Sequence, residues 1–246
     1  MKAKIIAFIQ EYKHGLLFLY GLVYIPWFTY LEQSVTTHFN VIHLVIDDYI
    51  PFIEYFIVPY MLWFLYVAAG VAYFFFRNKA EYYKLCIFLI TGMTVFLVIS
   101  TIYPNGTYLR PVVFERDNIF VDAVKWLYST DTPTNLFPSI HVYNSLAIHI
   151  AVSKNEKLKN NKLVLHASRI MMSSIILATV FLKQHSLFDV ITAFALAGLM
   201  YVLLYTPAWV RDFMQPDRTS KEIKKKRIKE AICPHRFELT SQSAGE

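Results

Sequence analysis

The chain has 246 residues, of which 56% are hydrophobic and 17% aromatic, and its mean hydropathy is +0.38. These values exclude an ordinary soluble domain, because a soluble domain of this size has enough polar side chains to cover its core. The net charge of +6 is accompanied by no nucleic-acid-binding motif, so we expect a membrane as partner and no nucleic acid.

Six apolar stretches predict membrane-spanning helices. Four are uncharged and are each close to the ~20 residues that cross the hydrocarbon layer as a helix, namely residues 15–31, 55–76, 85–103 and 190–210. Two are less regular, since residues 133–153 open with two prolines and residues 163–182 contain Arg169. Spanning backbone must satisfy its own hydrogen bonds, and no alternating barrel pattern is present. We therefore predict an all-α integral membrane protein with six transmembrane helices in one domain, residues 15–210.

The distribution of Lys and Arg predicts the orientation. Of the 24 Lys and Arg residues, 20 fall on the side that holds the N-terminus, the tail and the segments 77–84 and 154–169. Because positive charge accumulates on the cytoplasmic side, we expect a multi-pass plasma-membrane protein with residues 1–14 and the basic tail 211–246 in the cytoplasm. The tail segment 220–232 either lies on anionic lipid or is only a solvated orientation signal.

Two outward connections are expected to carry structure. Residues 37–50 are too short and too polar to span a membrane, which predicts an interfacial segment. The connection 104–137 is 34 residues long, enough to suggest local structure or function. Apolar residues recur at helical spacing from Ile119 to Leu127, so we predict a short helix on the outer leaflet.

Polar side chains lie beside the predicted spans on the outward side. Arg110 follows the third span, and Ser139 and His141 lie where the fourth begins. His185 and Asp189 lie at the junction of the fifth and sixth spans. Each has an ordinary structural explanation when taken alone: a headgroup contact, a helix cap, and an ion pair that clamps a helix.

Together these side chains provide the parts of a phosphoryl-transfer site. Arg110 supplies a fork of donors suited to phosphate oxygens. His185 and Asp189 are four residues apart, so on a helix they share one face, and the carboxylate can orient the imidazole as a nucleophile. His141 is the candidate acid for a leaving oxygen. Ionisable groups at the edge of a membrane are costly and are usually functional.

The ordered segments "RP", "PSIH" and "HSLFD" resemble the motifs of the type-2 phosphatidic acid phosphatase superfamily, over an organisation that covers residues 52–200. The resemblance implies a bundle of six membrane helices and metal-independent chemistry on a lipid phosphate, without a cofactor. It implies His185 as the nucleophile that forms a phosphohistidine, with Asp189 as its orienting carboxylate. It further implies His141 as the acid for the leaving alkoxide. The phosphate-binding residues would be Arg110 and Ser139.

Three family positions differ in this sequence. The family's first lysine would be Tyr103, and its Ser-Arg pair would be Ala178 and Thr179. The glycine of its Pro-Ser-Gly-His motif is Ile140. Lys183 lies four residues after Thr179, on the same face of a continuous helix, so we predict that Lys183 replaces the missing arginine as a phosphate-binding residue. The alternative is a lysine that extends to the outer headgroups.

The remaining polar candidates have less to support a catalytic role. His149 lies eight residues after His141, about two turns along the same face, and is expected to be a packed polar residue. The acidic and imidazole groups of the segment 37–50 are expected to belong to a solvated interfacial segment, and they are His38, His43, Asp47 and Asp48.

We predict a phosphatase that hydrolyses a lipid phosphate or diphosphate at the outer face, on a phospholipid, polyprenyl or sphingolipid substrate. A lipid headgroup phosphotransferase of the sphingolipid or inositol-phosphate type uses the same intermediate. Phosphatase is favoured over transferase because no acceptor pocket can be read from the sequence. Other classes stay open: a proton-relaying transporter, a metal site of His141, His185 and Asp189, and an inactive membrane scaffold. The sequence sets neither the lipid nor the oligomeric state.

Overall fold

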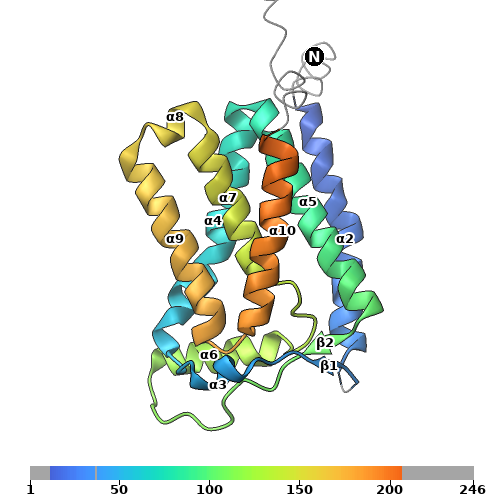
Figure 1. Cartoon of the computed structure of the whole chain (residues 1–246), viewed down its shortest axis with the longest axis vertical. Helices are drawn as coiled ribbons and strands as arrows, with labels where there is room; N and C mark the ends of the chain where they lie inside the picture. The colour runs from blue at the N-terminus through green and yellow to red at the C-terminus, as the bar shows by residue number, and fades with distance from the viewer. Residues whose placement is uncertain (1–11, 37, 207–246) are drawn as a thin grey trace, which may run out of the picture. The chain divides into compact units, whose positions relative to one another are not determined.

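The computed structural model describes residues 12–36 and 38–206, and these residues form a bundle of helices (Figure 1). The first helix begins as η1 Lys13–Tyr20 and continues as α2 Gly21–Ser34. The predictions for the basic tail 211–246, and for nearly all of the cytoplasmic segment 1–14, lie outside the described residues.

Most of the described chain is helical, as predicted. The elements after α2 are, in chain order, α3 Val45–Tyr49, η2 Glu54–Phe56, α4 Ile57–Arg77, α5 Lys79–Ile102, α6 Ile119–Thr130, α7 Ile140–Lys154, α8 Glu156–Lys159, α9 Lys162–Phe181 and α10 Leu187–Tyr205. Two short strands, β1 Asn40–Val41 and β2 Asn105–Gly106, pair in parallel.

Asparagine and serine side chains begin several of these helices. Asn78 accepts a hydrogen bond from the main-chain N–H of Glu81 at the start of α5, and Asn118 accepts from two N–H groups of α6. Ser139 accepts from Val142 at the start of α7. These polar side chains satisfy N–H groups that have no partner within the helix. Helices α5, α6 and α7 therefore begin where a short polar side chain precedes them, whereas α2 and α4 begin without a side-chain cap.

Among the described residues, five helices are long and apolar enough to cross a membrane, which fits an integral membrane protein. They cover Lys13–Ser34, Glu54–Arg77, Lys79–Ile102, Lys162–Phe181 and Leu187–Tyr205. Their outer faces expose large apolar side chains, including Leu22, Leu65 and Leu203. The predicted span at 133–153 differs, because its helix α7 has only 15 residues. The two prolines and the extended chain before Ile140 shorten it.

Helix α7 lies at the centre of the bundle, packed against α4, α5 and α9. Nine of its residues are buried, including Tyr143, whose hydroxyl donates to the carbonyl of Phe88 at 2.8 Å. A Cβ atom at Gly92 of α5 would lie 1.9 Å from the Tyr143 ring, so only glycine fits there. Close approach of α5 and α7 therefore depends on Gly92.

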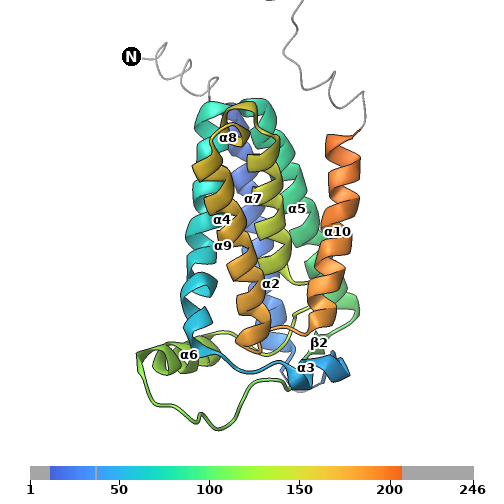
Figure 2. The same ribbon diagram turned by 60° about the vertical axis from the view of Figure 1, so that its left-hand side comes forward.

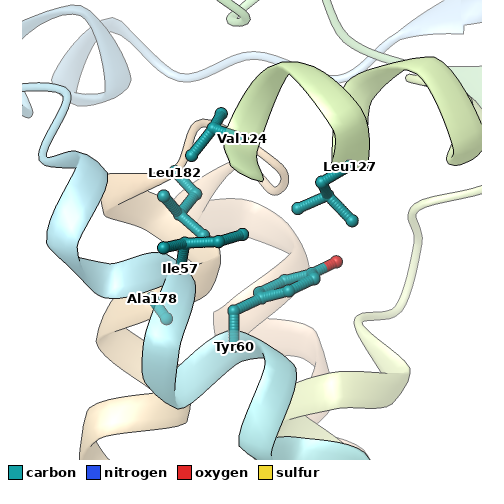
Figure 3. Close-up of a cluster of buried hydrophobic side chains, with 6 residues drawn as sticks. All are labelled: Ile57, Tyr60, Val124, Leu127, Ala178 and Leu182. Atoms are coloured by element: carbon teal, nitrogen blue, oxygen red, sulfur yellow. The ribbon is translucent and has the colours of Figure 1, made fainter. Parts of the chain in front are cut away.

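One end of the bundle carries α3, α6 and the two strands (Figures 1 and 2). The predicted helix in the connection 104–137 is confirmed as α6. Its apolar face packs on the ends of α4 and α9 rather than on lipid, in a cluster of Ile57, Tyr60, Val124, Leu127, Ala178 and Leu182 (Figure 3). This packing places the 104–137 connection across the end where α7 and α10 begin.

Candidate active site

The three motif segments meet at the end of the bundle that α6 covers. Ser139 and His141 lie at the start of α7, Asp189 lies in the first turn of α10, and His185 lies in the turn just before α10. The main-chain N–H of Ser139 lies 3.4 Å from the carbonyl oxygen of Asp189, which joins the two helix starts directly. Arg110 reaches the same region from the loop after β2, through Gln184. The structure therefore brings together groups that are up to 79 residues apart.

The two candidate catalytic histidines face each other. The imidazole rings of His141 and His185 lie 5.6 Å apart between centroids and are inclined by 61°. His141 is held between two aromatic rings of α4, Tyr60 at 4.6 Å and Trp63 at 4.4 Å. Its Nδ1 atom is buried and has no hydrogen-bond partner in the described part of the chain. Both rings are close enough to contact one phosphoryl group.

Asp189 lies against His185 as predicted, but the two residues do not share a helical face, because α10 begins only at Leu187. Its Oδ2 atom is 3.4 Å from His185 Nδ1, and both side chains are nearly fully buried. The same Oδ2 accepts a hydrogen bond from the main-chain N–H of Ser186 at 3.0 Å. Catalytic hydrogen bonds are often long in the absence of substrate and shorten when it binds. The pair can therefore orient the His185 ring, with Nδ1 towards the carboxylate.

Arg110 is held by main-chain oxygens. Its guanidinium donates to the carbonyl groups of Tyr128, Asp131 and Thr132 and to Gln184 Oε1. It lies 4.5 Å above the centroid of the Tyr128 ring. Its Nε atom is buried without a partner among the described residues. The guanidinium is thereby fixed to the side chain of Gln184, the residue that precedes His185.

Ser139 acts as a helix cap here, the ordinary explanation weighed for it. Its Oγ accepts from the N–H of Val142 at 3.4 Å. The first-turn N–H groups of Ile140 and His141 have no main-chain partner within α7, because helix geometry supplies none. These two donors, rather than the serine hydroxyl alone, are available to an anion at the start of α7.

The geometry predicted for Lys183 is wrong. Helix α9 ends at Phe181, and Lys183 has a φ angle of +54°, so Lys183 does not share a helical face with Thr179. Its Nζ donates to the main-chain oxygen of Asp47 at 2.6 Å. The Lys183 ammonium therefore contacts the 37–50 segment.

The other positions where the family pattern is lost also have structural roles. Thr179 is buried, and its hydroxyl donates to the carbonyl of Ile176. Near Tyr103, the Oδ1 atom of Asn105 accepts from the N–H groups of Leu136 and Phe137. Its Nδ2 donates to the carbonyl of Tyr103. Asn105 therefore holds the chain that leads into α7.

The lower-ranked histidines and carboxylates divide into two groups. His149 forms a hydrogen bond with Ser168 at 3.0 Å and is a packed polar residue, as predicted. His43 and Asp48 pair with each other on the surface at 2.8 Å. Asp47, however, is only 1% exposed, so the prediction of a solvated segment is wrong at this residue.

Several residues of the site were missed in the sequence. Asp131 lies with its carboxylate 3.7 Å from Arg110, and Tyr60 and Trp63 enclose His141. Gln184, beside His185, could have been found from the sequence, because an amide in an apolar segment needs a hydrogen-bond partner. Tyr60 and Trp63 of α4 could not have been singled out in the sequence, because the same helix contains many other aromatic residues.

The Asp131 carboxyl changes the charge of the site with pH. Partial burial raises its pKa to about 6, and the Arg110 guanidinium opposes this rise. The group is therefore neutral in acid and becomes a carboxylate as the pH rises through about 6. Above that pH, Asp131 competes with any bound anion for Arg110.

An apolar cavity of about 360 Å³ adjoins the site. Its polar end is formed by His141 and Asp131, and the rest is lined mainly by aromatic and methionine side chains of α2, α4 and α5, including Phe28, Phe64 and Met93. Such a cavity suits an alkyl chain, whose polar end would lie at His141.

No protein-family model, curated protein or solved structure matches the chain. Within residues 12–36 and 38–206, no group of three or more His, Cys, Asp and Glu side chains could hold a metal ion. His141, His185 and Asp189 thus do not converge as a metal site there.

Proposed function

We propose that the protein is a metal-independent lipid phosphatase, related to the type-2 phosphatidic acid phosphatase superfamily. The observation that supports this most is the pair of facing imidazoles, His141 and His185, beside the apolar cavity. One imidazole is backed by a carboxylate, and the other borders the space for a lipid chain. This asymmetry supports His185 as the nucleophile and His141 as the leaving-group acid.

In the first step, a ring nitrogen of His185 attacks the phosphorus of the lipid phosphate. The bond between phosphorus and the lipid oxygen breaks, and protonated His141 gives its proton to that oxygen. In the second step, His141 takes a proton from water, and the water oxygen attacks phosphorus. The bond between phosphorus and His185 breaks and inorganic phosphate is released.

The charge that develops on the phosphoryl oxygens has two sources of stabilisation. The Arg110 guanidinium is held next to His185 through Gln184, and its Nε–H is unused. The first turn of α7 offers the N–H groups of Ile140 and His141 in the field of the helix N-terminus. These donors act without a metal ion, because fixed dipoles and a guanidinium can neutralise an oxyanion.

We further propose that α7 is a sixth crossing of the membrane, with the site at the outer face. A 15-residue helix is about 22 Å long, less than the hydrocarbon thickness. The chain before it is not helical, but Thr134, Leu136 and Pro138 are buried in protein. Non-helical backbone at membrane depth is tolerated when protein surrounds it.

The test is release of inorganic phosphate by the purified protein from phosphatidate, phosphatidylglycerophosphate, a polyprenyl diphosphate and a sphingolipid phosphate. EDTA should not change the rate. His185→Ala should abolish it, whereas His43→Ala, a change at an exposed histidine, should not. Phosphate release that persists in His185→Ala, or none from any lipid in the wild type, would overturn the proposal. A phosphorylated alcohol formed in place of phosphate would identify a transferase.

A further inference from the structure

A buried carboxylate outside the catalytic set connects the 37–50 connection to the nucleophile. The part of this connection from residue 38 to residue 50, here called the strap, crosses the end of the bundle and contains β1 and α3. Asp47 of the strap is 1% exposed, while its neighbours Ile46 and Asp48 lie on the surface. A buried carboxylate is costly unless its oxygens are satisfied.

Every oxygen of Asp47 accepts a hydrogen bond. Oδ1 accepts from the N–H of Leu187 at 2.8 Å, and Oδ2 accepts from Ser186 Oγ at 2.6 Å and from the N–H of Leu44 at 2.8 Å. Its main-chain oxygen accepts from Lys183 Nζ at 2.6 Å. Two of the four donors, Lys183 and Ser186, belong to the turn between α9 and α10, and a third, Leu187, is the first residue of α10. These three residues lie on both sides of His185 in the sequence.

Ser186 carries this contact to the catalytic pair. Its hydroxyl donates to Asp47, and its main-chain N–H donates to Asp189 Oδ2 at 3.0 Å. That same oxygen lies 3.4 Å from His185 Nδ1. The position of the Asp189 carboxylate thus depends on Ser186, and the position of Ser186 depends on Asp47.

Lys183 is held against the strap although burial disfavours its charge. Burial lowers the pKa of the Lys183 ammonium, and Asp47 and Asp48 oppose this effect. The turn has an unusual backbone, with Lys183 at a φ of +54°. A non-glycine residue in this region is held there by its surroundings. The contact of Lys183 with the strap is one such restraint.

We propose that Asp47 is a positioning residue for the phosphoryl-transfer reaction: through Ser186 it holds Asp189, and thereby the His185 ring, in the attacking orientation. This inference rests on the proposed function. Asp47 differs from a residue that only caps a helix, because the residues that donate hydrogen bonds to it precede and follow His185 in the chain. Misplacement of a reacting group by ~1 Å can cost on the order of 10²-fold in rate.

The decisive variant is Asp47→Asn, which keeps the size of the side chain but cannot accept from all three donors. We expect kcat to fall on the order of 10²-fold while KM is unchanged, because the phosphate and lipid contacts remain. Asp47→Glu should recover part of kcat. Asp48→Asn is the matched control: Asp48 is the adjacent carboxylate, but it is exposed and pairs with His43, so this variant should behave as the wild type.

Two further measurements separate positioning from simple stability. Nitrogen NMR of labelled histidine, with His185 assigned by its loss in His185→Gln, should show one Nδ1–H tautomer in the wild type and a mixture in Asp47→Asn. Ser186→Ala should also reduce kcat, although it removes the acceptor of the Phe188 N–H as well. The loss in the double variant should be smaller than the sum of the two single losses, because both changes remove the hydrogen bond between Ser186 and Asp47.

The proposal is overturned if Asp47→Asn leaves kcat and the His185 tautomer unchanged, or if the losses of Asp47→Asn and Ser186→Ala add. It is also overturned if Asp47→Asn, Asp47→Glu and Ser186→Ala all fail to fold, since Asp47 would then serve the fold alone. Absence of phosphatase activity in the wild type would overturn the proposed function instead, and the tautomer measurement would still decide the role of Asp47.

Discussion

Two sets of buried polar residues, each containing a histidine of α7, differ in how far they are satisfied. In the set of His149, Ser168 and Tyr66, the serine hydroxyl binds the imidazole at 3.0 Å and the phenol at 2.7 Å. In the set at the start of α7, the Nδ1 atoms of His141 and His185 have no hydrogen-bond partner among the described residues.

The difference supports our proposal that the set at the start of α7 binds the substrate. Buried polar groups are nearly always hydrogen-bonded, so each exception requires an explanation. At the start of α7 the exceptions cluster, and they also include Arg110 Nε, Asp189 Oδ1 and Gln184 Nε2. A phosphate brings acceptors for the donors among these groups, and a leaving oxygen accepts the proton of His141. The His149 set needs no such partner, and its role is to join α4, α7 and α9.

The first variant that tests this comparison is His141→Ala, which should lower kcat more than the variants described below. Loss of a general acid reduces kcat about 10²- to 10⁴-fold for a lipid whose leaving group is an ordinary alcohol. For an aryl phosphate, whose leaving group needs no proton, the loss should be much smaller. Rates for the two substrates check this, and equal losses would contradict the assignment of His141 as acid.

Lys183→Met tests whether Lys183 restrains the turn before α10 or binds the phosphate. Loss of the ammonium removes its hydrogen bond to Asp47, and kcat should fall roughly tenfold, the factor that corresponds to a charged hydrogen bond of about 1.5 kcal/mol. Binding of inorganic vanadate should not change, because Lys183 faces the strap. Lys125→Met, at an exposed lysine of α6, is the control. Weaker vanadate binding would instead restore Lys183 to the phosphate site.

A smaller effect is expected at Asp131. As the pH rises through about 6, Asp131 becomes a carboxylate that pairs with Arg110 and repels an anion. Asp131→Asn should therefore tighten vanadate binding about fivefold at pH 8, for ~1 kcal/mol between charges about 4 Å apart, and have little effect at pH 5. Titrations at both pH values measure this. A pH-independent ratio would show that Asp131 does not compete for Arg110.

The smallest effect on activity is expected from a change in the set of His149, Ser168 and Tyr66. Ser168→Ala removes the hydroxyl that binds His149 and Tyr66, although the Tyr66 hydroxyl keeps the main-chain oxygen of residue 168 as an acceptor. The free energy of unfolding should therefore fall by about 1–3 kcal/mol, mainly through His149. The rate of phosphate release should stay at the wild-type level when the protein is folded. Thermal unfolding and phosphate release, measured on the same sample, test both statements.

The sequence predicted helices and the grouping of Arg110, His141 and His185 well, because apolar runs and isolated polar groups are local features. It did not predict Asp47, whose burial depends on a contact with residues 136 or more positions away. The prediction for Lys183 failed for a related reason: it assumed a continuous helix, whereas α9 ends at Phe181 and the chain turns. Tertiary contacts, and not local pattern, decide both positions.

The measurement that tests the central claim most directly is trapping of a phosphoenzyme. Rapid acid-free denaturation during turnover of a labelled lipid phosphate should leave phosphate on the protein, stable in alkali and lost in acid. Mass spectrometry of the peptide should place it on His185, and His185→Gln should trap none. Phosphate on another residue, or turnover without any trapped phosphoenzyme in both the wild type and His141→Ala, would contradict the account.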